Sequence, residues 1–387
     1  MPPAAPRKPM TASRYAVPYT DLAREAGAIK PELLRAFEAV LDSGRYILGP
    51  QLAAFEQEFA AYCGTRYAVG IASGTAALHL SLLAFGVRAG DEIITAPNSF
   101  VATTAAIALS GARPVFVDIR SDGNIDPARI ERAITPRTRG VLPVHVAGRP
   151  AAMPQIVEVA RRHGLFVLED AAQSIGARLG DTRTGAFGDA ACFSLNPLKN
   201  LHAFGDGGMV TTDREDIYRY LLKARSHGLA DRERCDFWSF NCRLDELQAA
   251  LLRVQLPHLD AWTEARRTLA ARYHRLLREH VEVPEEGPGE YCVYQTYVVL
   301  AGERDALQRH LNANGVEALV HYATAIHQQP AARELGYAGA DLPLTCRHVG
   351  RILSLPLYPG LTHAQQDRVA ERVARFYESH GARRREA

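Results

Sequence analysis

Lys199 is the residue of this sequence whose type and setting most clearly suggest chemistry. The chain has four lysines, Lys8, Lys30, Lys199 and Lys223, against many arginines. Lys199 alone lies in a long loop between two strand-like runs, within SLNPLKNLHAFGDGG. A lysine amine can lose its proton and act as a nucleophile, which a guanidinium cannot do. The setting favours a reactive amine, with an ordinary surface lysine as the alternative.

Two further segments place polar groups where apolar runs end. Asp170 closes the run LFVLED, a position at which parallel sheets bind ligands and at which a helix-capping aspartate is the simpler interpretation. Gly74 and Thr75 follow the run YAVGIAS and precede a helical pattern. Free amides at a helix start, with glycine allowing close approach, suit a phosphate, although an ordinary strand-to-helix turn has the same pattern.

The elements that must position these residues follow an α/β pattern. Short apolar runs at 67–72, 91–96, 114–119, 140–146 and 165–171 alternate with helical patterns at 75–85, 101–110, 126–134 and 153–163. Such alternation predicts βαβ units and a mainly parallel sheet with helices on both faces. Two more strand-like runs, 190–195 and 207–212, flank the loop that carries Lys199, and a loop of that length is usually functional.

The second half of the chain predicts a smaller domain. Residues 243–280 are strongly helical with a break at Pro257, and the remainder suggests strands at 297–301 and 316–320 and helices at 304–315 and from His363. We predict a disordered tail over 1–13, a large α/β domain over 14–257 and a small α+β domain over 258–387.

Composition excludes several classes of protein. The 387 residues include 45 Lys and Arg against 43 Asp and Glu, so no charge excess favours a nucleic acid or an anionic membrane. No apolar run reaches the ~20 residues of a membrane-spanning helix and no signal peptide is evident, so we expect a cytoplasmic protein. The six cysteines form no metal or disulfide pattern, and His321 and His327 lack partners for a metal site, so none is expected.

Many segments, in order, resemble the DegT family of sugar aminotransferases, which are fold type I pyridoxal phosphate enzymes. They include ASGTAALHL, PNSFVATTAA, PVHVAGRP, EDAAQS, GAFGDAACFSLNPLKNLHAFGDGGMVTT, FNCRLDELQAA and SLPLYPGLT. The resemblance extends from about Tyr19 to Val369. It implies that Lys199 holds the cofactor covalently and that Asp170 contacts the pyridine nitrogen.

The resemblance also assigns the other cofactor contacts. Gln173 matches the residue near the ring hydroxyl, Phe100 the residue that stacks on the ring, and Ser194 with the Gly74 and Thr75 amides the phosphate site. Asn241 matches an asparagine that reaches the phosphate from the neighbouring subunit, which implies a homodimer with shared active sites. The sugar-contact candidates, each with a core or surface role as the alternative, are Arg225, His227, His321 and Tyr322.

The resemblance implies transfer of an amino group from L-glutamate to a nucleotide-linked keto sugar. A keto sugar phosphate or a cyclic keto-polyol is the alternative acceptor. Family members that dehydrate sugars have histidine in place of the lysine, which Lys199 argues against. A regulatory protein that keeps the fold is the non-enzymatic alternative, and it predicts loss of residues that this chain retains. The sugar, nucleotide, ring carbon and product configuration do not follow from the sequence.

Overall fold

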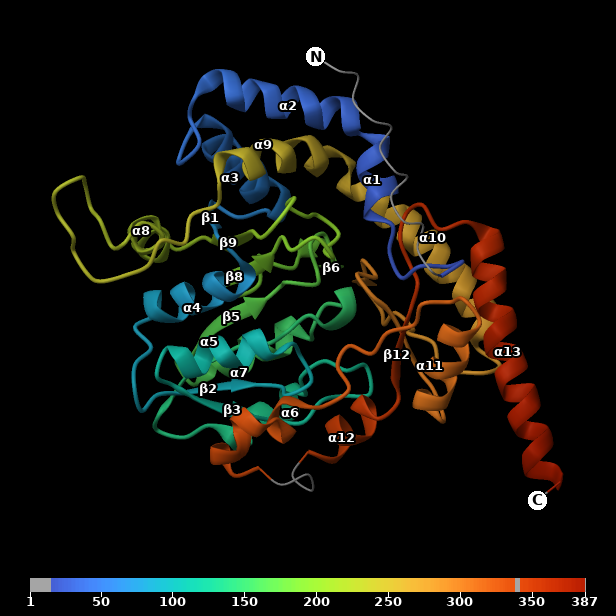
Figure 1. Ribbon diagram of the computed structural model, residues 1–387. Helices are drawn as coiled ribbons and strands as arrows, with labels where there is room; N and C mark the ends of the chain where they lie inside the picture. The colour runs from blue at the N-terminus through green and yellow to red at the C-terminus, as the bar shows by residue number, and fades with distance from the viewer. Residues whose placement is uncertain (1–14, 338–341, 387) are drawn as a thin grey trace, which may run out of the picture.

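A seven-stranded sheet forms the centre of the computed structural model, which describes residues 15–337 and 342–386 (Figure 1). Its strands are β1 (Tyr67–Ile71), β2 (Glu92–Thr95), β3 (Arg113–Phe116), β4 (Thr138–Val141), β5 (Phe166–Asp170), β8 (Ala190–Ser194) and β9 (Gly208–Thr212), in the order β1-β9-β8-β5-β4-β2-β3. Within it only β9 runs antiparallel to its neighbours. The predicted α/β core is confirmed, whereas the predicted tail lies outside the described residues.

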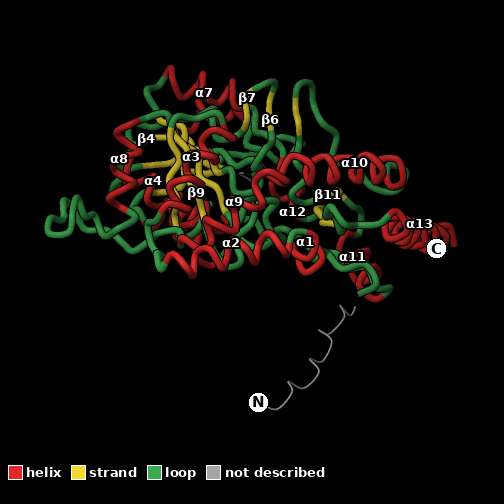
Figure 2. Tube along the Cα trace, turned by 90° about the horizontal axis from the view of Figure 1, so that it is seen from above, coloured by secondary structure: helices red, strands yellow, loops and turns green. Residues whose placement is uncertain are grey.

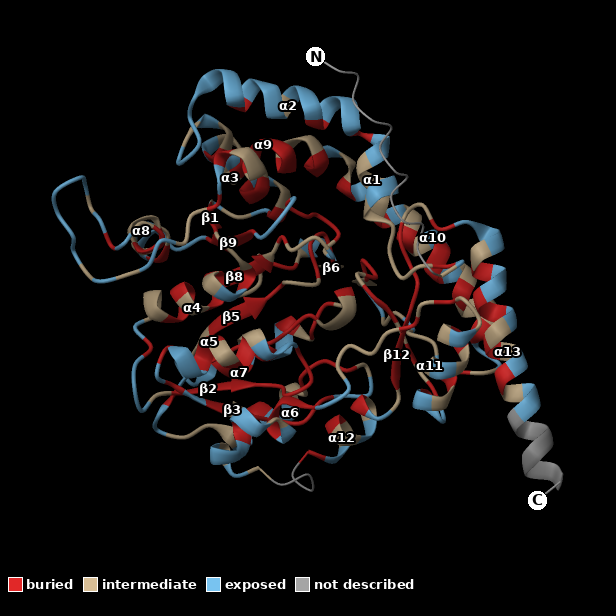
Figure 3. Ribbon diagram, viewed as in Figure 1, coloured by how far each residue is buried: buried red, intermediate tan, exposed pale blue. Residues whose placement is uncertain are grey.

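Both faces of this sheet are covered by helices, because successive strand side chains point to opposite sides. In β8, Cys192 packs toward α4 (Gly74–Ala84), α5 (Val101–Leu109) and α8 (Glu215–Ala224). Its neighbour Phe193 packs toward α3 (Pro50–Cys63) and α9 (Glu246–Gln255). Further along the sheet, the face to which Phe193 points is covered by α6 (Pro127–Ile130) and α7 (Met153–Arg162). Figure 3 shows the strands as a buried layer between these helices.

The C-terminal half adds a smaller α+β layer beside the sheet (Figure 2). Its helices are α10 (Leu259–Leu277), α11 (Arg304–Ala313) and α13 (His363–Glu386), and its strands β11 (Tyr297–Leu300) and β12 (Ile352–Leu355) pair antiparallel. They share one apolar core, which Val17 from the N-terminal segment joins. The strand expected at 316–320 is absent; Val316 and Leu319 make single bridges only, because their partners lie in different segments.

One stretch of the C-terminal half returns to the large sheet. The 3-10 turns Ile326–Gln328 and Pro330–Leu335 and helix α12 (Pro343–Val349) lie near β3, where Ile326 and Leu342 pack on Phe116. Asp118, just after β3, accepts hydrogen bonds from the backbone N–H groups of residues 344 and 345 at 3.0 and 2.8 Å and so caps α12. The boundary at residue 258 remains a prediction, and these contacts cross it.

The remaining elements lie at the periphery. Helices α1 (Leu22–Ala28) and α2 (Lys30–Ser43) precede α3, and α2 packs on α9. A small sheet joins β10 (Glu290–Tyr291), β6 (Arg178–Leu179) and β7 (Thr182–Arg183). Within the described ranges, no helix has both the length and the apolar composition needed to cross a bilayer.

Candidate active site

The loop that carries Lys199 begins where β8 ends, at the edge of the sheet formed by the carboxyl ends of the parallel strands. It is folded tightly: the Lys199 N–H donates to the Asn196 carbonyl at 2.9 Å, and the Ala203 N–H donates to the Leu195 carbonyl at 2.8 Å. Burial of the Lys199 amine lowers its pKa to about 8, and the nearby Asp170 carboxylate opposes this shift. The amine can therefore be neutral, and nucleophilic, near physiological pH.

Asp170 ends β5 with its carboxylate almost fully buried. Oδ2 accepts a hydrogen bond from the Thr103 hydroxyl at 2.7 Å, and Oδ1 accepts one from the Ala172 N–H at 3.2 Å. Burial raises the pKa of Asp170, while these two donors and the charge of Lys199 lower it. A buried carboxylate with an incomplete set of partners is suited to a positively charged group of a ligand.

A second buried carboxylate supports the end of β5. Glu169 accepts backbone N–H donors from Gly185, Phe187 and Gly188 at 3.0, 2.9 and 2.8 Å. His145 contacts it through Nε2 at 2.9 Å and accepts the Ala151 N–H through Nδ1 at 3.0 Å, so Nε2 carries the proton that is donated. The fully satisfied Glu169 fixes the strand, which leaves Asp170 as the carboxylate available to a ligand.

The start of α4 meets the end of β8 at Gly74. A Cβ built on Gly74 would lie 2.8 Å from Ser194 Cβ, so only glycine allows this approach. The Ser73 hydroxyl accepts the Ala76 N–H at 3.1 Å, whereas the earlier amides of Gly74 and Thr75 have no acceptor within the helix. The free amides at this helix start therefore lie beside Ser194, an arrangement that fits a phosphate group.

Aromatic and polar side chains lie around the same end of the sheet. Phe100, at the start of α5, is 51% exposed and lies 5.3 Å from the Tyr322 ring between centroids. Burial, and to a smaller extent the charge of Asp170, raises the pKa of Tyr322 to about 12. Burial, and to a smaller extent the charge of Lys199, lowers the pKa of His321. The structure thus brings Phe100, His321 and Tyr322 to the site.

A cavity of about 800 Å³ opens beside these residues. Ser99, Gln173, His321 and Tyr322 form its wall near the site, whereas Lys199 and Asp170 are not part of the wall. Gln173 is fixed there because its Oε1 accepts the Ala147 N–H at 2.7 Å. The cavity therefore leads to the side of the site at which Gln173 lies and offers room for a substrate.

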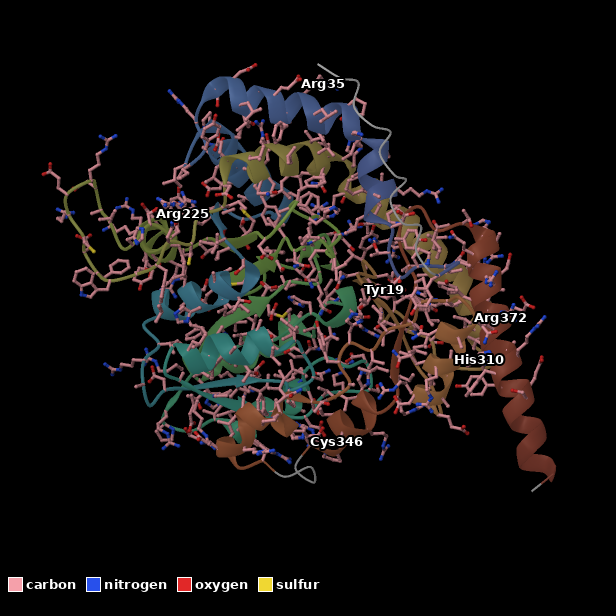
Figure 4. The ribbon with its side chains drawn as sticks, in the orientation of Figure 1. Tyr19, Arg35, Arg225, His310, Cys346 and Arg372 are labelled. Atoms are coloured by element: carbon pink, nitrogen blue, oxygen red, sulfur yellow. The ribbon has the colours of Figure 1, made fainter. Side chains whose placement is uncertain are left out.

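Three residues that the resemblance assigned to substrate or cofactor contacts lie away from this site in the same chain. The Arg225 guanidinium is buried against Glu56 and donates to the Gly70 carbonyl at 3.2 Å, so it holds α8 to α3 and is not presented to the cavity. Figure 4 shows Arg225 beside α8, far from Tyr19, which contacts His321. His227 and Asn241 are exposed at the base of the projecting loop between α8 and α9.

The sequence did not single out Thr103, which contacts Asp170 directly, or Ser99, which contacts Thr103. The segment PNSFVATT did contain a signal, because Ser99 and Thr103 are four residues apart at a helix start and share one side. It also missed His202, whose Nδ1 lies 3.2 Å from the Lys199 carbonyl oxygen. No local pattern predicts that contact, since it depends on how the loop folds.

The chain is similar to known proteins over most of its length. The model of the DegT/DnrJ/EryC1/StrS aminotransferase family matches residues 28–374. A "Pleiotropic regulatory protein" of Geobacillus stearothermophilus is 43% identical over 366 residues, 93% of this chain and 98% of the relative. The dTDP-3-amino-3,4,6-trideoxy-alpha-D-glucose transaminase of Streptomyces venezuelae is 41% identical over 365 residues, 94% of this chain and 96% of the relative.

Among solved structures, S. venezuelae DesV in complex with a ketimine intermediate superposes with a TM-score of 0.91 at 42% identity, covering 94% of this chain and 98% of that one. Lys199, Asp170 and the Gly74–Ser194 contact provide an amine, a carboxylate and a phosphate site, which together fit pyridoxal phosphate. The chain therefore belongs to the DegT/DnrJ/EryC1/StrS aminotransferase family, whose enzymes depend on that cofactor.

Proposed function

We propose that this enzyme transfers the amino group of L-glutamate to a keto sugar carried on a nucleotide. The observation that carries the proposal is the pairing of a depressed-pKa lysine with a buried carboxylate in a chain similar to a transaminase of a dTDP-linked sugar. Bound pyridoxal phosphate would supply the carbonyl group that carries the amine and an electron-withdrawing ring.

Lys199 has two tasks in this proposal. Its neutral amine holds the cofactor covalently until the amino donor displaces it. The freed amine then moves a proton to and from the substrate carbon, for which a pKa near the working pH is best. Burial supplies that pKa, and Asp170 keeps it from falling further.

The other residues hold the cofactor in place. Asp170 would keep the ring nitrogen protonated, because a buried carboxylate favours a positive charge beside it. The exposed ring of Phe100 would cover one face of the pyridine, and Gln173, which lines the cavity, would lie near the ring hydroxyl. Gly74, Thr75 and Ser194 would hold the phosphate.

We further propose that the active unit is a homodimer in which Asn241 contacts the phosphate in the partner's site. In one chain the loop that carries Asn241 projects on the side of the sheet opposite α10 and α13 (Figure 1). Near its end, Trp238 is 94% exposed and Phe240 is 55% exposed. Large apolar side chains of this kind favour burial against another surface.

The test separates the two half-reactions. Loaded enzyme is first mixed with L-glutamate, and loss of the aldehyde form of the cofactor is followed by absorbance. The amino form is then offered nucleotide-linked keto sugars, keto sugar phosphates and keto-inositols in single turnovers. We expect recovery of the aldehyde form with a nucleotide-linked sugar, since the remote nucleotide contributes binding energy that orients the ketone.

Recovery with only the phosphorylated or free ketones would support the alternative acceptor. Failure of L-glutamate, but not of other amino acids, to produce the amino form would contradict the proposed donor. A protein that binds no pyridoxal phosphate would support the regulatory alternative instead, and would contradict the proposed roles of Lys199 and Asp170.

A further inference from the structure

We propose that Thr103, supported by Ser99, is a positioning residue that holds the Asp170 carboxylate ionised and correctly oriented toward the cofactor's ring nitrogen. The inference rests on the role proposed for Asp170. It concerns a hydroxyl pair that does not touch the reacting atoms and acts through a neighbouring side chain.

The geometry is a short chain of three buried groups. Thr103 Oγ1 lies 2.7 Å from Asp170 Oδ2, and Ser99 Oγ lies 3.0 Å from Thr103 Oγ1. Thr103 is 1% exposed and Ser99 is 5% exposed, so the Thr103–Asp170 contact is shielded from bulk water. The second oxygen, Oδ1, is held by the Ala172 N–H at 3.2 Å, and the carboxylate plane is therefore defined by contacts at both oxygens.

The direction of the hydrogen bonds follows from the donor inventory. An ionised carboxylate accepts only, so the single Thr103 proton is directed to Asp170. Ser99 can then donate to Thr103, which polarises the Thr103 hydroxyl and strengthens its bond to the carboxylate. Without these donors, burial would favour the neutral acid, which could not retain a positive charge on a ring nitrogen.

The same helix start couples this task to the ring face. Phe100 precedes α5 as its N-cap residue and Thr103 lies in its first turn. The Thr103 N–H donates to the Phe100 carbonyl at 3.2 Å, so the backbone that directs Thr103 to Asp170 is bonded directly to the backbone of Phe100. A shift of α5 would disturb both contacts together.

The experiment measures equilibrium binding to the apoprotein of two ligands, pyridoxal phosphate and its 1-deaza analogue, in which CH replaces the ring nitrogen. The wild-type protein should prefer pyridoxal phosphate. Thr103→Val keeps the side-chain shape but removes the hydroxyl, and we expect it to lower this preference by about tenfold or more, as loss of a hydrogen bond to a charged group does. Thr103→Ser should restore most of the preference, and Ser99→Ala should lower it less.

Thr104→Val is the matched control, because Thr104 is the adjacent, also buried threonine and its hydroxyl has no hydrogen-bond partner among the described residues. It should leave the preference unchanged. If Thr103→Val weakens binding of both ligands equally, or if Thr103→Ser fails to rescue, Thr103 has only a structural role and the inference is wrong. Asp170→Ala should abolish the preference; if it does not, the role proposed for Asp170 fails first, which distinguishes the two errors.

Discussion

Lys199 is the residue whose chemistry depends most directly on its surroundings. Burial opposes its charge and the carboxylate of Asp170 favours it, and burial is the larger effect, so the pKa is lowered to about 8. Arginine could not replace it, because a guanidinium stays protonated in proteins. The scarcity of lysine in the sequence, and the loop in which Lys199 lies, already indicated this residue.

The lowered pKa predicts how the apoprotein takes up its cofactor. Below about pH 8 most Lys199 amines are protonated and unreactive, so the rate of covalent capture of pyridoxal phosphate should rise with pH and level off above that value. Stopped-flow absorbance from pH 6.5 to 9.5 measures it. Pyridoxamine phosphate forms no bond to Lys199 and is the control. A midpoint near 10.5, the value of a solvated lysine, would contradict the effect of burial.

At the scale of elements, the site depends on where helices begin. The start of α4 lies against the end of β8 because Gly74 has no side chain. The start of α5 supplies Phe100 and Thr103. Both helices follow strands of the parallel sheet, so their positive ends lie at the sheet edge that also carries Asp170 and Lys199.

Gly74→Ala tests the contact between α4 and β8. The added methyl would meet Ser194 at 2.8 Å, so the strand and helix must separate, and the affinity for pyridoxal phosphate should fall about tenfold or more. Gly27→Ala is the control. Gly27 lies in α1, and apart from its chain neighbours and its own helix backbone no atom of the described residues lies within 4 Å of the added carbon, so this variant should be slightly more stable or unchanged. An unchanged dissociation constant for Gly74→Ala would show that this contact does not shape the phosphate site.

The sequence predicted the strands and helices of the large domain well, because periodic apolar patterns are local. It could not predict contacts between distant segments. Thr103 and Asp170 are 67 positions apart, Arg225 and Glu56 are 169 apart, and Asp118 caps α12 across 227 positions. Arg225 is an example. The resemblance suggests it as a sugar contact, but its guanidinium is bound to Glu56 of the same chain.

At the scale of the whole molecule, several large apolar side chains are exposed on the surface that would be buried in the proposed homodimer. They lie on α2 and the segment after it and in the loop that carries Asn241, and include Leu34, Phe37, Leu41, Tyr46, Ile47, Leu48, Trp238 and Phe240. The outward face of α2 is visible in Figure 3. Exposed apolar side chains in such number are consistent with the homodimer that we propose.

Complementation tests whether the sites are shared. Lys199→Ala and Asn241→Ala proteins should each have little activity, but after subunit exchange each heterodimer contains one site without a lesion. Random exchange of equal amounts should therefore restore about a quarter of the wild-type specific activity. Exchange is verified with two affinity tags. No recovery in verified heterodimers would mean that Asn241 serves its own subunit or none.

Borohydride reduction tests whether Lys199 is the covalent anchor of the cofactor. Loaded enzyme is reduced, digested and mapped by mass spectrometry for a phosphopyridoxyl group, with Lys199→Ala as control. We predict the modification on Lys199 alone and its loss in the variant, because burial lowers the pKa of the Lys199 amine, whereas Lys30 is exposed on α2 and Lys223 is paired with Asp236. Modification of Lys30 or Lys223 at equal stoichiometry, or its persistence in the Lys199→Ala protein, would contradict the claim.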